Sequence, residues 1–277
     1  MRVAVAAGIA GGVAGGSAYA TKEILSRQAA HARRLIGKPL GEDALRADRT
    51  WKKKYGARID LLMLGDSIAA GLGAETPRQT PGARLGRKLA RRTGRAVRLT
   101  TAAVVGSETS ALAQQIDGLR TGYRPDVAVI VVGGNDVTHR IPTATSTAQL
   151  AEAIDRLRDL GAAVVVGTCP DLGALRPVPQ PLRALGSRAS RLLAEAQRVV
   201  ALEHGAHAVS LAAVVGPFFI TNPDEMFSLD RFHPSAQGYK RTANALLPSV
   251  LAALGEHDAE LPFGHHAPGR VGSSARP

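Results

Sequence analysis

Five short apolar segments, separated by longer helical patterns, are the feature of this sequence that most limits its fold. The segments are residues 59–64, 97–104, 127–132, 162–168 and 206–211. They are rich in valine, leucine and alanine, as is typical of strands that are buried on both faces of a parallel sheet. Because strands that alternate with helices run parallel to one another, the pattern predicts a flavodoxin-like three-layer α/β/α sandwich with a five-stranded parallel sheet.

The segments between these strands carry helix start and stop signals. Pro81 opens a helical pattern that ends at Gly94, and Ser235 is a good N-cap for the last helix. Hydrophobic residues make up 45% of the chain but aromatic residues only 4%, so small aliphatic side chains must fill the core. A chain of 277 residues is long enough for one such core. We therefore predict one α/β domain over residues 58–255.

The two ends of the chain have a different composition. Residues 3–20 carry no charge, which fits a cleaved signal peptide, a membrane anchor or a soluble helix, and the sequence leaves the choice open. Residues 21–57 are predicted to form a basic helical connector. Residues 256–277 have no apolar periodicity, so we predict a disordered tail. The predicted location is therefore membrane-associated or exported.

The charge distribution limits the expected partners. The net charge is +12, and residues 22–58 hold eleven Lys/Arg against four Asp/Glu. This excess fits either a solubilising surface or attraction to an anionic membrane. Nucleic acid is not expected as a partner, because no nucleic-acid motif accompanies the charge. The single cysteine, Cys169, excludes an internal disulfide, and the oligomeric state stays open.

Polar motifs follow the first three predicted strands, and a fourth precedes the last helix. The motifs are Gly65-Asp66-Ser67, Gly106-Ser107, Gly133-Gly134-Asn135-Asp136 and Asp230-x-x-His233. In open parallel sheets, ligands bind beyond the carboxyl ends of the strands. Each motif alone is a common turn sequence, but together at successive strand ends they predict one shared site.

The residue types in these motifs suit nucleophilic catalysis. A serine hydroxyl is a poor nucleophile until a neighbouring base takes its proton, and the pKa range of histidine suits that role. Asp230, three residues before His233, could orient the imidazole. Backbone N–H groups of Ser67 and Gly106, with the amide of Asn135, could donate hydrogen bonds to an oxyanion. We expect Gly106 because a side chain there would obstruct close approach of the backbone.

On these four motifs the sequence resembles the SGNH/GDSL hydrolase family over residues 59–250. The resemblance implies a serine esterase of flavodoxin-like fold. It implies Ser67 as nucleophile, His233 as base, Asp230 as its orienting partner, and Ser67, Gly106 and Asn135 as oxyanion donors. We expect no cofactor. We also expect no metal, because the Asp and His residues show no ligand cluster at helical spacing.

Four of the five phenylalanines lie close to Asp230 and His233 in sequence, at positions 218, 219, 227 and 232. They predict either an apolar wall for an acyl chain or a small core under a long loop. Phe227 and Phe232 are the candidate substrate-binding residues. The favoured substrate is a lipid or lysophospholipid-like acyl ester. The alternatives are deacetylation of acetylated cell-envelope glycans, and a membrane-tethered binding protein of the same fold without turnover.

Overall fold

A single mixed sheet organises the chain. In the computed structural model, which describes residues 3–256 and 260–269, the sheet has seven strands in the order β1-β3-β2-β4-β5-β6-β7. The five inner strands are parallel. They are β2 (Arg58–Gly65), β3 (Ala96–Thr101), β4 (Val127–Val131), β5 (Ala163–Gly167) and β6 (His207–Val209). The predicted α/β fold is confirmed, and each predicted strand corresponds to one of these five.

The predicted number of strands is wrong, because an antiparallel strand of two residues lies at each edge. β1 (Thr50–Trp51) pairs with β3, and β7 (His265–His266) pairs with β6. Two residues are too few to show an alternation of apolar and polar side chains. These strands are held by backbone hydrogen bonds to the neighbouring strand. Trp51 is nonetheless part of the core, with 7% of its surface exposed.

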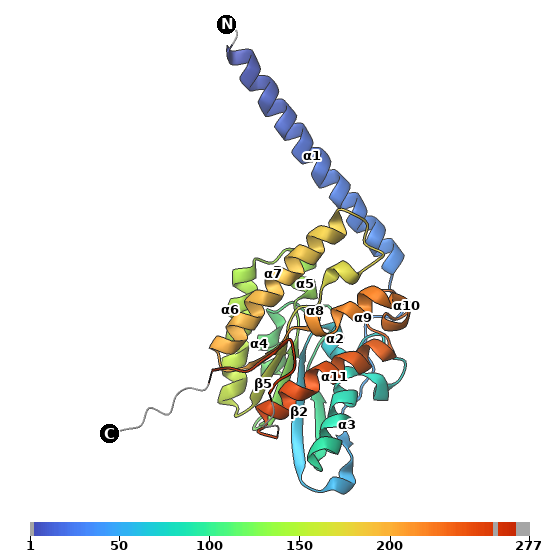
Figure 1. Ribbon diagram of the computed structural model, residues 1–277, viewed down its shortest axis with the longest axis vertical. Coiled ribbons are helices and arrows are strands. Elements are labelled where there is room, and N and C mark those ends of the chain that lie inside the picture. Colours follow the sequence, from blue (N-terminus) through green and yellow to red (C-terminus); the bar gives the residue numbers. More distant parts are fainter. Residues whose placement is uncertain (1–2, 257–259, 270–277) are drawn as a thin grey trace, which may run out of the picture.

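Helices cover both faces of the sheet, as Figure 1 shows. α3 (Pro81–Thr93) and α11 (Ala236–Ala253) pack on one face, whereas α4 (Ala111–Asp117), α6 (Thr143–Asp159) and α7 (Leu182–Glu203) pack on the other. Successive side chains of β2 alternate between them: Leu61 and Met63 join the first core cluster, Leu62 and Leu64 the second. Both faces of the inner strands are therefore buried.

Short helices follow several strands on the side where the inner strands end. They are α2 (Ser67–Ala70), α5 (Gly134–His139), α8 (Leu211–Val214), α9 (Gly216–Thr221), α10 (Pro223–Met226), and the 3-10 helices η2 (Pro77–Gln79) and η3 (Leu172–Ala174). A further 3-10 helix, η1 (Lys53–Tyr55), follows β1. Several of these helices carry the motifs that the sequence places at the strand ends.

The segment before the sheet differs from the predicted helical connector. α1 (Val3–Ile36) runs through residue 20 without a break, and after it residues 37–49 contain no helix. Gly37 ends the helix with a φ of 56°, a left-handed conformation that favours glycine. In Figure 1 the C-terminal part of α1 lies near α7, where the Gln28 side chain donates a hydrogen bond to the Gln180 carbonyl at 2.6 Å.

Within residues 3–256 and 260–269, no helix combines the length and the apolarity that a membrane crossing needs.

The prediction of a disordered tail is wrong for residues 260–269. β7 pairs with β6, the Ser210 N–H donates to the Gly264 carbonyl at 2.8 Å, and His265 Nε2 lies 2.6 Å from the Ala245 carbonyl. These contacts are made by backbone groups and a histidine, so the sequence contains no apolar pattern that would predict them. Residues 257–259 and 270–277 lie outside the described residues.

Candidate active site

The turn after β2 presents Ser67 at the end of the sheet. Gly65 has a φ of 127°, and a Cβ added there would lie 1.8 Å from the Val131 carbonyl oxygen of the neighbouring strand. Only glycine fits this close approach. The buried side chain of Gln115 holds the turn from both sides. Its Oε1 accepts from the Gly65 N–H at 2.9 Å, and its Nε2 donates to the Gly65 carbonyl at 2.8 Å.

Asp66 precedes the nucleophile candidate and acts as the N-cap of α2. Its Oδ1 accepts a hydrogen bond from the Ile68 N–H at 2.9 Å. The Asp66 side chain is almost fully buried, and this burial raises its pKa from 3.8 to about 7, with a smaller contribution from the negative charge of Asp136. Asp136 has a similar structural role, because its side chain accepts a hydrogen bond from the Thr109 N–H at 3.1 Å.

A hydrogen-bonded chain joins Ser67, His233 and Asp230. His233 Nε2 lies 2.9 Å from Ser67 Oγ, and His233 Nδ1 lies 2.5 Å from Asp230 Oδ2. The other carboxylate oxygen of Asp230 accepts from Ser228 Oγ at 2.8 Å and from the N–H groups of Phe232 and His233 at 2.9 Å each. All three residues are largely withdrawn from solvent.

The electrostatics of Asp230 keep it ionised. Burial opposes ionisation, but the hydrogen bonds from the His233 side chain and from the two backbone N–H groups outweigh it, so the pKa of Asp230 is lowered. An ionised Asp230 accepts from Nδ1–H of His233, which leaves Nε2 free to accept the Ser67 proton. The arrangement is therefore suited to proton transfer from the serine hydroxyl.

Gly106 lies in a tight turn beside the Gly65 backbone. The turn is closed by a hydrogen bond from the Ser107 N–H to the Val104 carbonyl at 3.3 Å, and the Val104 N–H donates to the Gly65 carbonyl at 3.1 Å. Gly106 has a φ of 82°, yet a Cβ added there meets nothing within 4 Å. No neighbouring protein atom therefore excludes a side chain at this position, and the left-handed conformation is what favours glycine in the folded chain. Close approach of this backbone to an oxyanion stays a prediction.

Asn135, in α5, connects this turn with the cavity that lies next to Ser67. Its Nδ2 donates to the Ser107 carbonyl at 2.8 Å, which uses one of the two amide hydrogens. Asn135 also lines the same cavity as Ser67, whereas Gly106 is tied to that cavity only through Ser107. The structure thus places Ser67 and Asn135 at one cavity, and it places Gly106 next to Ser107, whose carbonyl accepts from Asn135.

An apolar cavity of about 80 Å³ lies next to Ser67. Phe227 and Phe232, the predicted substrate-binding residues, both line it, as does Phe219. The rings of Phe219 and Phe227 pack edge to face with centroids 4.9 Å apart. The other phenylalanine of the cluster, Phe218, lies outside the lining, with the Arg241 guanidinium 4.0 Å from its ring centroid. The lining also includes Ile68, Pro170, Leu172, Ala174, Leu175, Leu211 and Val215.

Several supporting residues had no recognisable signal in the sequence. Gln115 is one, and Gln197 is another: its Oε1 accepts from the Cys169 N–H at 2.7 Å and its Nε2 donates to the Val132 carbonyl at 3.1 Å. Cys169 is fully buried, and burial raises the pKa of its thiol, as is typical of a structural cysteine. Within the described residues, no group of three His, Cys, Asp or Glu side chains could hold a metal ion.

Comparison with known sequences finds a matching family model and a similar curated protein. A model of the GDSL-like lipase/acylhydrolase family matches residues 63–241. The GDSL-like esterase Rv1075c of Mycobacterium tuberculosis is 38% identical over 264 residues, which cover 91% of this chain and 83% of the relative.

Comparison with solved structures agrees with the fold. The crystal structure of TesA shares 27% sequence identity and a TM-score of 0.56 over 70% of this chain and 99% of its own. A lipase/acylhydrolase from Enterococcus faecalis, at 21% identity, matches with a TM-score of 0.57 over 74% of this chain and its whole length. Residues 1–62 lie before the region that the family model matches.

Proposed function

Because this chain belongs to the GDSL-like lipase/acylhydrolase family and is a carboxylic ester hydrolase of that type, we propose that Ser67 is its nucleophile. The hydrogen-bonded chain from Ser67 through His233 to Asp230 is the observation that carries this proposal. Ser67 Oγ attacks the ester carbonyl carbon while His233 Nε2 takes the hydroxyl proton. The alcohol then leaves with that proton, and an acyl group stays on Ser67.

Water completes the cycle on the same residues. His233 removes a proton from the water that attacks the acyl-enzyme, and returns it to Ser67 Oγ when the carboxylic acid departs. Asp230 stays ionised throughout and stabilises the imidazolium form of His233 through its short contact with Nδ1. Burial of the carboxylate strengthens this interaction, because little water competes for it.

Three donors support the tetrahedral intermediates in this proposal. They are the backbone N–H groups of Ser67 and Gly106 and the second amide hydrogen of Asn135. Each donor of this kind contributes about 2.7–4 kcal/mol to transition-state stabilisation. The hydrogen bond from Asn135 to Ser107 supports the assignment, since it couples the turn that holds Gly106 to the helix that holds Asn135.

The acyl group occupies the apolar cavity beside Ser67. Its volume is about 80 Å³, whereas an apolar void of about 150 Å³ accommodates benzene. We therefore propose an ester with a short acyl chain, which contacts Phe227 and Phe232. A long-chain lipid ester is the second candidate: the apolar lining favours it, as does Leu229, which is 86% exposed beside Asp230. Such a chain would have to extend outside this cavity.

A series of p-nitrophenyl esters tests both parts of the proposal. With acetyl, butanoyl, octanoyl and dodecanoyl esters, we expect kcat/KM to be highest for the acetyl or butanoyl ester. We expect Ser67→Ala to lose hydrolysis and covalent labelling by a fluorophosphonate while keeping its fold.

Every other result of these experiments leads to a specific conclusion. Full hydrolysis by Ser67→Ala excludes Ser67 as nucleophile. A maximum at octanoyl or dodecanoyl excludes the short-chain proposal and favours the lipid ester. A strict preference for acetyl favours deacetylation of a glycan. If the wild-type protein shows neither labelling by the fluorophosphonate nor hydrolysis of any ester, the result favours a binding protein of the same fold.

A further inference from the structure

A stripe of apolar side chains runs along the solvent side of α7. Leu185, Leu192 and Val199 follow one another at intervals of seven residues, with 50%, 60% and 38% of their surface exposed. Ala189 is exposed and Ala196 is half-buried, each four residues after one of the leucines. Because residues at these intervals share one face of a helix, the five side chains form a continuous line, the α7 stripe.

The α7 stripe is not the face with which the helix packs on the sheet. That face is formed by other side chains, which are buried: Ser190, Leu193, Ala194, Gln197 and Ala201. A helix that covers one side of a domain needs a single apolar face and is polar on the others. Single exposed apolar residues are common on protein surfaces, but a regular second stripe on one helix indicates an interaction site.

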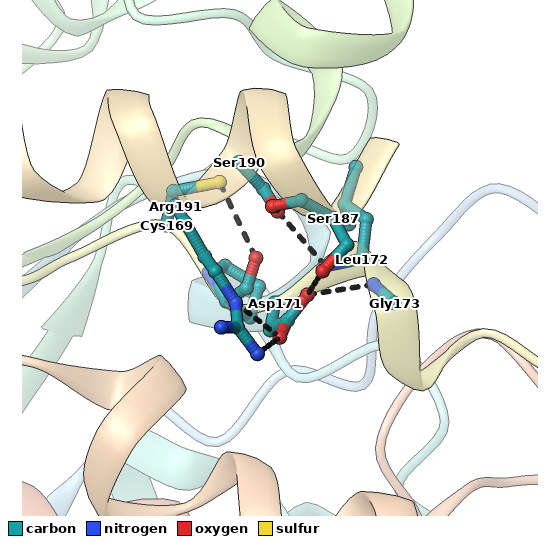
Figure 2. Close-up of polar contacts among 8 residues, drawn as sticks. Cys169, Asp171, Leu172, Gly173, Ser187, Ser190 and Arg191 are labelled. Carbon is teal, nitrogen blue, oxygen red and sulfur yellow. Dashed lines mark hydrogen bonds and ion pairs between the residues drawn. The ribbon is translucent and has the colours of Figure 1, made fainter. Parts of the chain in front are cut away.

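Polar contacts on another side of the helix hold α7 in place, as Figure 2 shows. Ser187 Oγ donates to Asp171 Oδ1 at 2.7 Å, and an Nη atom of Arg191 lies 2.7 Å from Asp171 Oδ2. Ser190 Oγ accepts from the Leu172 N–H at 3.1 Å. The α7 stripe therefore lies on a helix that is already fixed, so little conformational entropy is lost when it packs against a partner.

The order of residues in the α7 stripe is that of a coiled-coil seam. The apolar positions are separated alternately by four and three residues, as d and a positions are in a heptad repeat. The large side chains of the stripe occupy d positions, and its two alanines occupy a positions. Small side chains at one of the two positions let two helices approach closely. A seam of this kind is covered by another helix with the same spacing.

The charges that flank the α7 stripe favour an antiparallel copy of the same helix. Arg188 and Glu195 lie on one side of the stripe, each at a g position directly before an alanine. When two copies of α7 run antiparallel with Ala189 opposite Leu192, Arg188 of each copy lies opposite Glu195 of the other. Two-fold symmetry gives this contact twice. In a parallel pair each charge would face an e position of the other helix, and the facing e positions of α7 are apolar.

Both charged side chains are accessible for this contact. Arg188 is exposed, and it forms no ion pair with any carboxylate of residues 3–256 and 260–269. Glu195 pairs with Arg198 of its own helix at 2.5 Å, but 61% of its side chain remains exposed. A carboxylate has acceptor positions for more than one guanidinium group, so Glu195 can keep Arg198 and accept a second arginine.

We propose that a second copy of this chain packs against the α7 stripe, with the two helices antiparallel and Arg188 of each copy paired with Glu195 of the other. A single helix pair gives an interface at the small end of the range for protein complexes, so the dimer dissociates on dilution. The α7 stripe lies outside the lining of the cavity beside Ser67, so each copy keeps its own active site. The proposal is therefore independent of the ester that the protein hydrolyses.

Charge reversal tests this interface on the full chain. Arg188→Glu and Glu195→Arg each place two pairs of like charges across it, so we expect the dissociation constant of the dimer to rise by more than about tenfold. The two variants carry opposite charges at both contacts, so an equimolar mixture of them should form a heterodimer. The double variant Arg188→Glu/Glu195→Arg should again dimerise by itself. Sedimentation velocity over a range of protein concentrations measures association, and ester hydrolysis checks that each variant is folded.

Arg120→Glu is the matched control, because it makes the same change of charge at an exposed residue outside α7. It should keep the wild-type dissociation constant. Leu192→Ala, which shortens the side chain at the centre of the stripe, should also weaken the dimer. A wild-type protein that stays monomeric even at high concentration, or a dimer that the substitutions in α7 leave unchanged, overturns the proposal. A dimer that Leu192→Ala weakens overturns it too if the two mixed variants fail to associate, because its helices are then not in the antiparallel register.

Discussion

His233 Nδ1 lies 2.5 Å from Asp230 Oδ2, and three other donors hold the second oxygen of that carboxylate. The carboxylate cannot rotate without losing those donors. The orientation of the imidazole, and with it the position of Nε2 opposite Ser67 Oγ, is therefore set by one rigid turn.

This relationship predicts the effect of Asp230→Asn. The three donors hold the amide oxygen in the Oδ1 position, so the amide nitrogen faces Nδ1 of His233 and donates to it. Nε2 then carries the proton and cannot accept one from Ser67, so we expect kcat to fall by about 10³–10⁴-fold. Hydrolysis of a butanoyl ester measures this, and circular dichroism checks the fold. Ser228→Ala, which removes one donor only, should lose less than about tenfold. A similar loss in both variants would argue against this tautomer mechanism.

Gln115→Leu tests the clamp on the turn before Ser67. The Gly65 N–H loses its partner in a buried site, so we expect the free energy of unfolding to fall by about 1–3 kcal/mol. We also expect kcat to fall, because the turn that presents Ser67 loses its support. Urea unfolding and ester hydrolysis measure the two effects. Gln114→Leu is the control at an exposed neighbour and should change stability by less than about 0.5 kcal/mol. Equal effects of the two substitutions would refute the clamp.

Two glycine substitutions should differ strongly. In Gly65→Ala the new Cβ would lie 1.8 Å from the Val131 carbonyl oxygen, so we expect little or no folded protein. In Gly106→Ala the Cβ meets nothing within 4 Å, and the cost is the left-handed conformation alone, about 1–2 kcal/mol. Soluble yield and thermal unfolding compare them. A Gly65→Ala protein as stable as Gly106→Ala would show that β2 can move away from β4.

The raised pKa of Asp66 predicts that the stability of the folded protein depends on pH. Its pKa is raised from 3.8 to about 7, chiefly by burial, so in this range the folded state binds a proton that the unfolded state has lost. The contribution of Asp66 to stability is therefore complete below pH 3.8 and is lost as the pH rises to about 7. Asp66→Asn removes this loss and keeps an oxygen for the Ile68 N–H.

Urea unfolding at about pH 5 and about pH 8 measures the effect. We expect the stability of Asp66→Asn relative to the wild type to increase between these two values. Asp224→Asn, at an exposed position of α10, should follow the wild-type pH dependence. A parallel pH dependence of the wild type and Asp66→Asn would show that Asp66 titrates normally.

The predictable parts of the fold are those that depend on local pattern. The five inner strands are apolar runs, because both of their faces are buried, and their predicted bounds differ by at most a few residues from the observed ones. β1 and β7 have two residues each and depend on the edge of an existing sheet, so no local pattern marks them. For the same reason the sequence alone assigns residues 50–51 and 265–266 to a connector and a tail.

Local sequence determined the chemistry that this protein carries. Ser67 lies just after the end of an apolar strand, and Asp230 and His233 lie three residues apart before the last helix. Each motif alone is a common turn sequence, but the order of the four motifs along the chain made them readable together. The tertiary structure alone decided how these motifs are supported and what surrounds them. Gln115 is 50 residues from Gly65, and the lining of the cavity beside Ser67 joins residues of η3, α8 and α9. An amide or a phenylalanine acquires such a role only from its neighbours in space, because its chemistry is the same wherever it occurs in the chain.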